Sequence, residues 1–252
     1  VAYPLRCTAI RTDMNIEGKN PVKEALDSNV AISKICISKT AHDLQSVVDT
    51  ARKKNIRVDF VDKAYLDRIS ESKRHQGIIA ISKDFQYCNV EDILKYARSK
   101  GEKLFLIILD GIEDPHNLGS IIRVAECAGA HGIVIPSRRS VGVNATVLRT
   151  SAGAANHMLI ASVANINDTI RNLKEDFVNV YCADMNGKSI YDSHLKEDMA
   201  IVIGSEGFGV KQLTAKLCTG IVSIPQFGKV NSLNASVACG IICYEAVRQR
   251  LK

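Results

Sequence analysis

Two serines and an asparagine lie close together near the end of the chain, between two apolar stretches. Ser232, Asn234 and Ser236 belong to a run, 224–238, that follows a short apolar strand and leads into an apolar helix. Side chains of these types cap helices and satisfy the backbone of turns. They also offer neutral donors and acceptors to a small polar ligand. The run alone leaves both interpretations open.

Two further polar loops follow apolar strands. The first, 109–123, contains Asn117 and ends at Arg123, which lies in an otherwise apolar stretch. An arginine there needs a partner or water, and holding a phosphate or carboxylate is its natural use. A helix N-cap at Asn117 and a surface position for Arg123 are the alternatives. Because ligands bind at the carboxyl ends of strands in open parallel sheets, these loops are candidate site elements.

The glycine-rich loop GSEGFG (204–209) does not fit a phosphate-binding motif. Its glycines are not in the order GxGxxG, and Glu206 places a carboxylate where a pyrophosphate would lie. The chain also lacks a GK[ST] sequence. A loop of this kind suits a cationic or neutral nucleoside ligand, and a tight turn with a solvated Glu206 is the alternative. Dinucleotide-dependent and triphosphate-dependent enzymes are therefore disfavoured.

The composition is that of a globular protein of one large domain or two ordinary ones. The chain has 252 residues, of which 46% are hydrophobic. Its eight cysteines form no CxxC pair, so no zinc site is expected. We see no signal-peptide pattern and no apolar run of membrane-spanning length. We therefore expect a reduced, cytoplasmic protein without a membrane span.

The positive charge is concentrated in the first part of the chain. The formal net charge is +6, and residues 1–100 carry 18 Lys and Arg against 13 Asp and Glu. An excess of this kind is compatible with a polyanionic partner such as a nucleic acid, although many soluble domains are as basic.

The apolar pattern predicts two α/β domains. Residues 1–13 are interpreted as a tail, 14–85 as a small domain, 86–102 as a linker and 103–252 as a larger domain. Strands alternate with helices in both domains, which favours parallel pairing with helices on the sheet faces. In the small domain, strands are expected at 34–38, 57–61 and 77–81. In the large domain, they are expected at 104–109, 132–135, 179–183, 199–203 and 220–224.

Three motifs together resemble those of the SpoU-type RNA ribose 2′-O-methyltransferases of the SPOUT superfamily. They are DPHNLGSIIRVAECAGA (114–130), IVIGSEGFGV (201–210) and IPQFGKVNSLNASVACGIICYEAVRQR (224–250). The segment that begins GKNPVKEAL and runs to about residue 84 is similar to the L30e-like substrate-binding domain of these enzymes. The subgroup most resembled methylates a guanosine ribose of large-subunit (23S) rRNA.

The resemblance implies a specific architecture and cofactor. It implies an α/β fold with a parallel sheet, a deep trefoil knot in the C-terminal SPOUT-type domain, and a homodimer whose active site draws on both subunits. It implies S-adenosylmethionine held by the knot loops and a structured RNA as substrate, with no membrane partner. The residues assigned to cofactor binding are Gly204, Ser205, Gly209, Ile224 and Leu233. Gln226 stands where the family usually has a methionine, and we expect little effect on cofactor binding.

The resemblance also assigns the reaction's polar residues. They are Asn117, Arg123, Glu206, Ser232 and Asn234. The reaction would transfer a methyl group from a sulfonium to a ribose 2′-oxygen, which needs orientation and proton management but no metal. The family suggests Arg123 as the general base, yet a guanidinium stays protonated in proteins, so it can instead stabilise charge on the oxygen. A tRNA substrate and a catalytically silent RNA-binding relative remain the alternatives.

Overall fold

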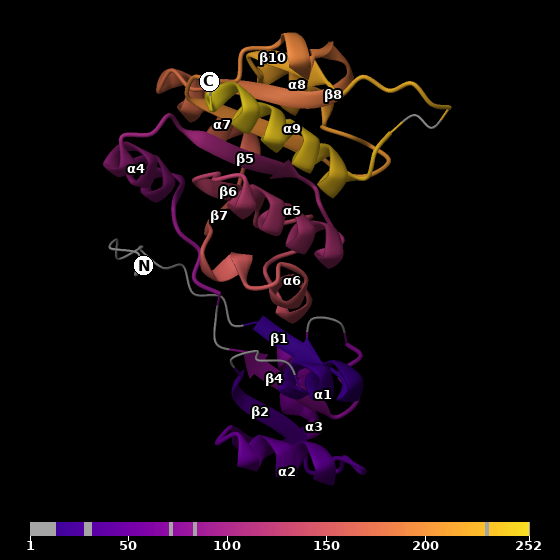
Figure 1. The fold of residues 1–252 in the computed structure, drawn as a ribbon. Coiled ribbons are helices and arrows are strands. Elements are labelled where there is room, and N and C mark those ends of the chain that lie inside the picture. The colour runs from indigo at the N-terminus through magenta and orange to yellow at the C-terminus, as the bar shows by residue number, and fades with distance from the viewer. Residues whose placement is uncertain (1–13, 28–31, 71–72, 83–84, 230–231, 252) are drawn as a thin grey trace. The chain divides into compact units, whose positions relative to one another are not determined.

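The computed structural model describes residues 14–27, 32–70, 73–82, 85–229 and 232–251 (Figure 1). The segment 1–13, predicted to be a tail, lies outside these residues. The described chain divides into two compact units, one that ends at Gln86 and one that begins at Tyr87. Each unit is an α/β structure built on its own sheet.

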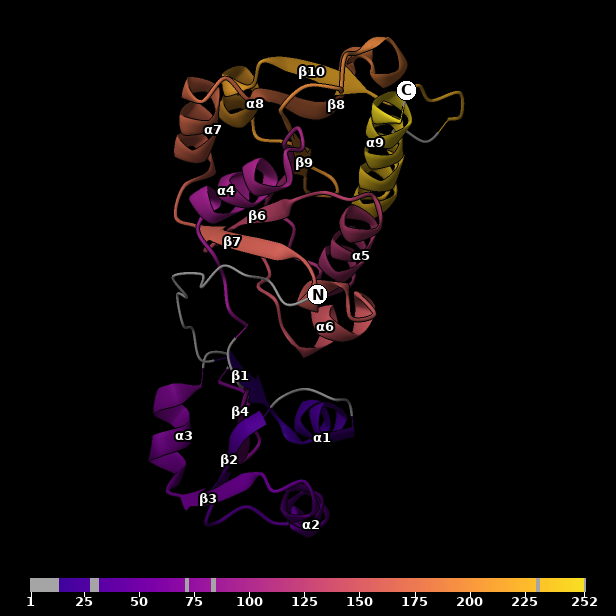
Figure 2. The same cartoon turned by 60° about the vertical axis from the view of Figure 1, so that its left-hand side comes forward.

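The first unit has a four-stranded sheet in the order β1-β4-β2-β3. Figure 2 shows α1 and α2 on one face of this sheet and α3 on the other. The first two helices bury Val22, Leu26 and Val48, and α3 buries Leu66. The strands are β1 Met14–Glu17, β2 Ile32–Ser38, β3 Arg57–Val61 and β4 Ile78–Ser82. The helices are α1 Lys19–Asp27, α2 Gln45–Lys53 and α3 Lys63–Ile69.

Parallel pairing holds for only one strand pair of this unit. Strands β2 and β3 are parallel, but β4 runs antiparallel to both β1 and β2. The fully parallel prediction for this sheet was wrong because β4 inserts between β1 and β2 instead of extending the sheet beyond β3. Strand β1 was not predicted, since four residues carry too little pattern to identify.

The second unit has a six-stranded, all-parallel sheet in the order β10-β8-β9-β5-β6-β7. Every residue of the central strand β5 is buried, as the apolar run predicted. The strands are β5 Phe105–Asp110, β6 Gly132–Pro136, β7 Leu159–Val163, β8 Asn179–Ser189, β9 Met199–Gly204 and β10 Gly220–Ser223. Strand β7 was not predicted.

Helices cover both faces of this sheet. Figure 2 shows α5 and α9 on one face and α4 and α7 on the other. The helices are α4 Val90–Lys100, α5 Pro115–Cys127, α6 Ala145–Thr150, α7 Ile166–Glu175, α8 Gln212–Leu217 and α9 Ala235–Arg250, with 3₁₀ turns η1 Ala154–Asn156 and η2 Ile190–Asp192. The segment 86–102, predicted to be a linker, contributes α4 to this unit, because Ile93 and Ala97 are part of its core.

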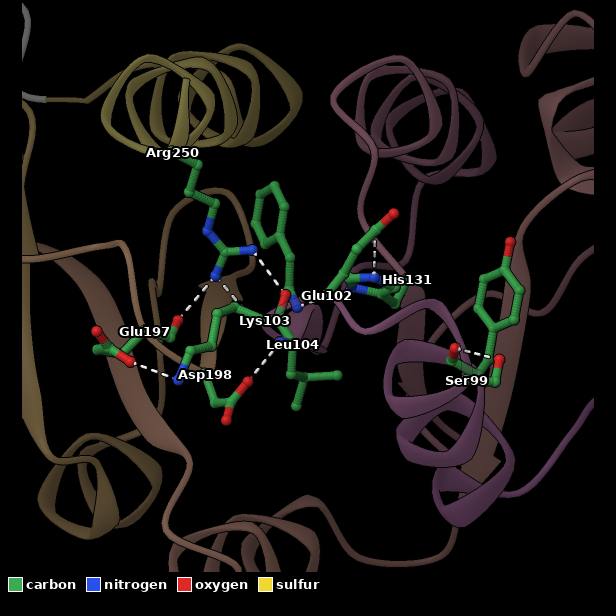
Figure 3. Close-up of polar contacts among 10 residues, drawn as sticks. Ser99, Glu102, Lys103, Leu104, His131, Glu197, Asp198 and Arg250 are labelled. Atoms are coloured by element: carbon green, nitrogen blue, oxygen red, sulfur yellow. Dashed lines mark hydrogen bonds and ion pairs between the residues drawn. The ribbon is translucent and has the colours of Figure 1, made fainter. Parts of the chain in front are cut away.

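Side chains close the amino end of this sheet (Figure 3). The Arg250 guanidinium, at the end of α9, donates to the carbonyl oxygens of Lys103, Leu104, Leu195 and Glu197 at 2.8–3.1 Å. It also stacks over the Phe105 ring, 5.1 Å from its centroid. The last helix is therefore tied to the starts of β5 and β9.

Candidate active site

The first turn of α5 buries Asn117 beside the carboxyl end of the sheet. The Asp114 side chain caps the helix by accepting from the His116 backbone N–H at 3.0 Å, and Pro115 fits the first helical position. Asn117 is 8% exposed, so its amide needs a hydrogen-bond partner within the fold.

That partner is Asn234, the N-cap of α9. Asn234 Oδ1 accepts from the backbone N–H groups of Ser236 and Val237 at 2.9 and 3.3 Å. Its Nδ2 donates to Asn117 Oδ1 at 2.9 Å and also to Glu206 Oε1. One side chain, that of Asn234, therefore caps a helix and also joins two of the polar loops. The capping interpretation of the run 224–238 and its interpretation as part of a ligand site do not exclude each other.

Glu206 is held at the start of α9. Besides Asn234, its Oε1 accepts from the Ala235 backbone N–H at 3.4 Å. A carboxylate is favourable there because the N-terminus of a helix carries unpaired N–H groups and partial positive charge. Glu206 is therefore held by Asn234 and by the backbone at the start of α9.

The glycine-rich loop is folded tightly against the end of β9. Ser205 and Gly209 exchange two backbone hydrogen bonds at 2.9 and 3.2 Å. A Cβ added at Gly204 would lie 2.0 Å from the carbonyl carbon of Gly209, so only glycine fits. The buried Asp110 carboxylate at the end of β5 accepts from the Lys211 backbone N–H at 3.1 Å and from its Nζ at 2.7 Å. This ion pair ties the far end of the loop to the central strand.

These loops form a cavity of about 290 Å³ at the carboxyl ends of β9 and β10, beside the middle of β8. We name it the acidic cavity because Asp184 and Glu206 line it, while its described lining includes no Lys, Arg or His. All five residues predicted for cofactor binding line it, and Ser232 does as well: Gly204, Ser205, Gly209, Ile224, Leu233. The cavity lies at the crevice that parallel α/β sheets use for ligands.

Arg123 is not part of this cluster. Its side chain is exposed on α5, two turns after Asn117, and it does not line the acidic cavity. Within the described part of the chain we find no hydrogen bond or ion pair to it. The structure thus joins Asn117, Glu206 and Asn234, with Ser232 on the cavity wall, and leaves Arg123 apart.

Cys182, which directly precedes the cavity residue Ala183, is unsuited to nucleophilic chemistry. The hydrogen bond with Cys218 and burial raise the pKa of Cys182 on β8, so this thiol stays protonated. Across the described residues, no group of three or more His, Cys, Asp and Glu side chains could hold a metal ion. Nor does any helix of those residues have the length and apolar character needed to cross a membrane.

Family models match both units of the chain. The model of the SpoU rRNA Methylase family matches residues 104–244. A second model, described as RNA 2'-O ribose methyltransferase substrate binding, matches residues 15–88. The chain belongs to the SpoU methylase family. It is therefore an RNA methyltransferase, and the resemblance predicted from the three motifs is confirmed.

Relatives of this SpoU methylase match it over nearly their whole length. The putative TrmH family tRNA/rRNA methyltransferase YacO of Bacillus subtilis is 40% identical, over 92% of this chain and 94% of the relative. Among solved structures, the AdoMet-bound rRNA methyltransferase of Sinorhizobium meliloti is 26% identical with a TM-score of 0.63, over 95% of this chain and 88% of that one. The A. aeolicus TrmH/SpoU tRNA modifying enzyme is 25% identical with a TM-score of 0.54, over 64% of this chain and 84% of that one.

Several cavity residues of the SpoU methylase unit were not predicted from the sequence. The middle of β8 supplies Ala183, Asp184 and Met185, and Gln226 lines the wall near Ile224. The sequence of a strand does not show that residues in its middle face a cavity formed by loops distant in the chain. Asp110 could have been predicted to form an ion pair or hydrogen bond, because an acidic residue at the end of a wholly buried strand needs a partner.

Proposed function

We propose that this chain methylates the 2′-hydroxyl of a ribose in structured RNA, with S-adenosylmethionine as methyl donor and a guanosine of 23S rRNA as target. The observation that carries the proposal is the acidic cavity beside the Asn117–Asn234–Glu206 cluster. Two carboxylates and no basic side chain in its described lining favour a cation over a phosphate. S-adenosylmethionine carries a sulfonium cation, which supplies an activated methyl group when bound.

The cavity also fits the rest of that cofactor. Ile224, Leu233 and Val222 provide apolar surface for a purine ring, and the backbone around Gly204 can approach a ligand closely because that loop is rich in glycine. Main-chain groups near Gly204, Ile224 and Leu233 would hold the cofactor, and the Ser205 and Gly209 ends of the loop would shape its wall.

The remaining polar residues would act on the ribose. Asn234 uses both of its amide hydrogens and its oxygen within the fold and thereby orients Asn117, so the remaining donor capacity of the Asn117 amide is fixed in direction before RNA binds. Glu206 holds Asn234, and Ser232 offers a hydroxyl on the cavity wall. Arg123 would bind the adjacent phosphate and stabilise negative charge that develops on the 2′-oxygen.

The exposed position of Arg123 supports a homodimeric active site. Helices α5 and α9 pack together, and α9 presents Val237 and Tyr244, which are 49% and 51% exposed, to its surroundings. A second copy covering these helices would bring its own Arg123 to the acidic cavity. We also propose that the C-terminal part of the chain completes the deep trefoil knot expected of a SPOUT-type domain.

The extent of the structural matches favours rRNA over tRNA. The rRNA methyltransferase of Sinorhizobium meliloti matches 95% of this chain, whereas the tRNA modifying enzyme of A. aeolicus matches 64%. Mapping 2′-O-methyl positions in rRNA and tRNA, with and without the enzyme, tests this choice. A new methyl group confined to tRNA would refute the rRNA target, and none in any RNA would indicate a catalytically silent relative.

Arg123→Ala tests the catalytic assignment. We expect the variant to fold and bind S-adenosylmethionine while methyl transfer falls by orders of magnitude, because a preorganised cation at a developing oxyanion is worth about a hundredfold or more. A tritiated-methyl assay on rRNA measures the loss. Arg149→Ala, which changes an arginine of α6 that does not line the cavity, is the control.

Mixing two inactive variants tests whether Arg123 acts across a dimer. If Arg123 serves the partner's site, a mixed dimer of Arg123→Ala and Asn234→Ala subunits has one site with both changes and one intact site. Activity would then return on mixing the unfolded chains and refolding them together. If both residues serve the same subunit, each site carries one defect and mixing restores nothing.

A further inference from the structure

A second cavity, of about 420 Å³, lies in the first unit. We name it the basic cavity because Lys19, Lys63 and Lys73 line it with a single carboxylate, that of Asp67. The loops after β2 and before β4 form its walls, together with the starts of α1 and α3. Its charge is therefore opposite to that of the acidic cavity, although the same chain builds both.

The floor of the basic cavity is a built structure, not a loose group of surface side chains. His75 is 4% exposed, and its Nδ1 accepts from the Gly77 backbone N–H at 3.1 Å. This fixes the tautomer in which Nε2–H donates to Asp67 Oδ1 at 2.9 Å. Ser38, 3% exposed at the end of β2, shares a hydrogen bond of 2.9 Å with Thr40 two residues later. The Asp67 carboxylate is thus engaged by His75, which lowers its pKa.

The loop 73–77 holds unfavourable backbone conformations at the cavity edge. Lys73 and Gln76 have φ angles of 58° and 52°, a region that side chains other than glycine rarely adopt. Gln76 is held there because its Oε1 accepts from the Lys19 backbone N–H at 3.1 Å. Strain of this kind concentrates where a fold positions groups for binding.

The lysines keep hydrogen-bonding capacity for a ligand. Lys19 Nζ donates to the His42 carbonyl at 3.0 Å, and Lys73 Nζ donates to the Asp67 carbonyl at 2.9 Å. Each ammonium has three donors, so each retains two. Lys63 forms no hydrogen bond or ion pair with the described residues that we can identify, although its charge acts on the Asp67 carboxylate across the cavity.

Building on the proposed function, we infer that the basic cavity binds a phosphodiester group of the RNA substrate. Three ammonium groups around a concave, partly buried polar floor match one phosphate and its ribose hydroxyls. The concave shape favours an unpaired strand, whose backbone can enter it, over the regular surface of a duplex. The first unit would then hold the RNA by its backbone, while the acidic cavity acts on the target ribose.

The test compares two triple variants of the full chain with equal loss of charge. The first replaces Lys19, Lys63 and Lys73 by Ala. The second, a matched control, replaces Lys23, Lys34 and Lys53, which lie on the same unit but do not line the cavity. Circular dichroism establishes that both fold, and filter binding measures the affinity for a large-subunit rRNA fragment at several salt concentrations.

We expect the cavity variant to bind RNA about 10- to 100-fold more weakly. The slope of log affinity against log salt concentration should also become less steep by up to about 2, because each single-strand phosphate contact contributes about 0.7 to it. The control should change both quantities much less. At saturating RNA, kcat should stay within about twofold of wild type. Equal losses in the two variants would overturn the inference. Absence of methyl transfer by wild type would refute the proposed function, whereas the binding comparison would still decide the cavity.

Discussion

The two ends of the parallel sheet in the second unit are built in opposite ways. At the amino end, side chains close the structure: Arg250 binds four carbonyl oxygens, and Asp198 accepts from the Leu104 backbone N–H. At the carboxyl end, glycines and short polar side chains leave the acidic cavity open between three strand ends. The same strands therefore carry stability at one end and ligand-binding capacity at the other.

This difference separates the expected consequences of substitution. The carboxyl end depends on backbone approach, as at Gly204, and on amide groups that orient one another, as at Asn117 and Asn234. The amino end depends on hydrogen bonds to backbone carbonyl groups, whose loss costs stability but leaves the cavity wall intact. Variants at the carboxyl end should lose ligand binding first, and variants at the amino end should lose stability first.

Gly204→Ala should have the largest effect. Its Cβ would lie 2.0 Å from the Gly209 carbonyl carbon and 2.2 Å from the Val210 nitrogen, so the loop must move away from β9. We expect no measurable methyl transfer and S-adenosylmethionine affinity at least about 100-fold lower, since overpacking a backbone contact costs about 1–3 kcal/mol or more. Isothermal titration calorimetry measures the affinity. Gly228→Ala is the matched control, because nothing lies within 4 Å of its added Cβ. Cofactor binding by Gly204→Ala at wild-type strength would contradict the role of this contact.

Arg250→Ala should have the next largest effect, and on stability. Removal of the guanidinium takes a donor from four carbonyl oxygens, of which only Leu104 keeps another within the described residues, the Met199 backbone N–H, so we expect a loss of roughly 2–4 kcal/mol in the free energy of unfolding. Urea unfolding measures this loss. S-adenosylmethionine affinity of the folded variant should stay within about threefold of wild type. Arg171→Ala is the control, because its exposed ion pair with Asp168 should contribute less than about 1 kcal/mol. If Arg250→Ala reduced the free energy of cofactor binding more than the free energy of unfolding, the effects of substitutions at the two ends of the sheet would not be separable.

The carboxyl end could be predicted from the sequence better than the rest of the fold. Asn117, Glu206 and Asn234 stand in motifs whose residue order is specific, so their proximity followed from the resemblance to SpoU-type enzymes. For Arg123 the sequence left a surface position open as an alternative, and the structure has it: Ile121 and Ile122 are wholly buried, while the Arg123 side chain is exposed. A run of apolar residues on a helix does not reveal which adjacent position faces outward.

The missed elements have local physical reasons. Strand β7 contains Ala161 and Ser162, which have weak strand preference, so its five residues resembled a loop. The antiparallel direction of β4 could not be read from alternating strands and helices, because direction depends on where a strand inserts. Arg250 binds backbone carbonyl groups of residues about 50 to 150 positions away in the chain. Every residue has a carbonyl group, so the sequence does not indicate which ones Arg250 binds.

His131 offers the smallest and most selective test of the amino end. It is 3% exposed at the start of β6, its Nδ1 accepts from the Phe105 backbone N–H at 3.0 Å, and its Nε2 contacts Glu102 at 3.0 Å. If the ring were protonated, its Nδ1–H would point at the Phe105 backbone N–H, and two donors would face each other. Burial lowers the pKa of His131 below its usual value, although the hydrogen bond to Glu102 raises it.

A lowered pKa in the folded state means that the unfolded chain binds more protons just below pH 6.5, so stability should fall as the pH decreases from about 6.5 toward that lowered pKa. One group contributes a slope of at most about 1.4 kcal/mol per pH unit. In His131→Asn, the side-chain oxygen can accept from the Phe105 backbone N–H but does not titrate. Acidification should therefore destabilise the wild type more than the variant. The difference between their free energies of unfolding should shrink as the pH falls. Urea unfolding of both proteins between pH 7.5 and about pH 5 measures it. If the free energies of unfolding of both proteins changed in parallel with pH, protonation of His131 would not affect the stability of the fold.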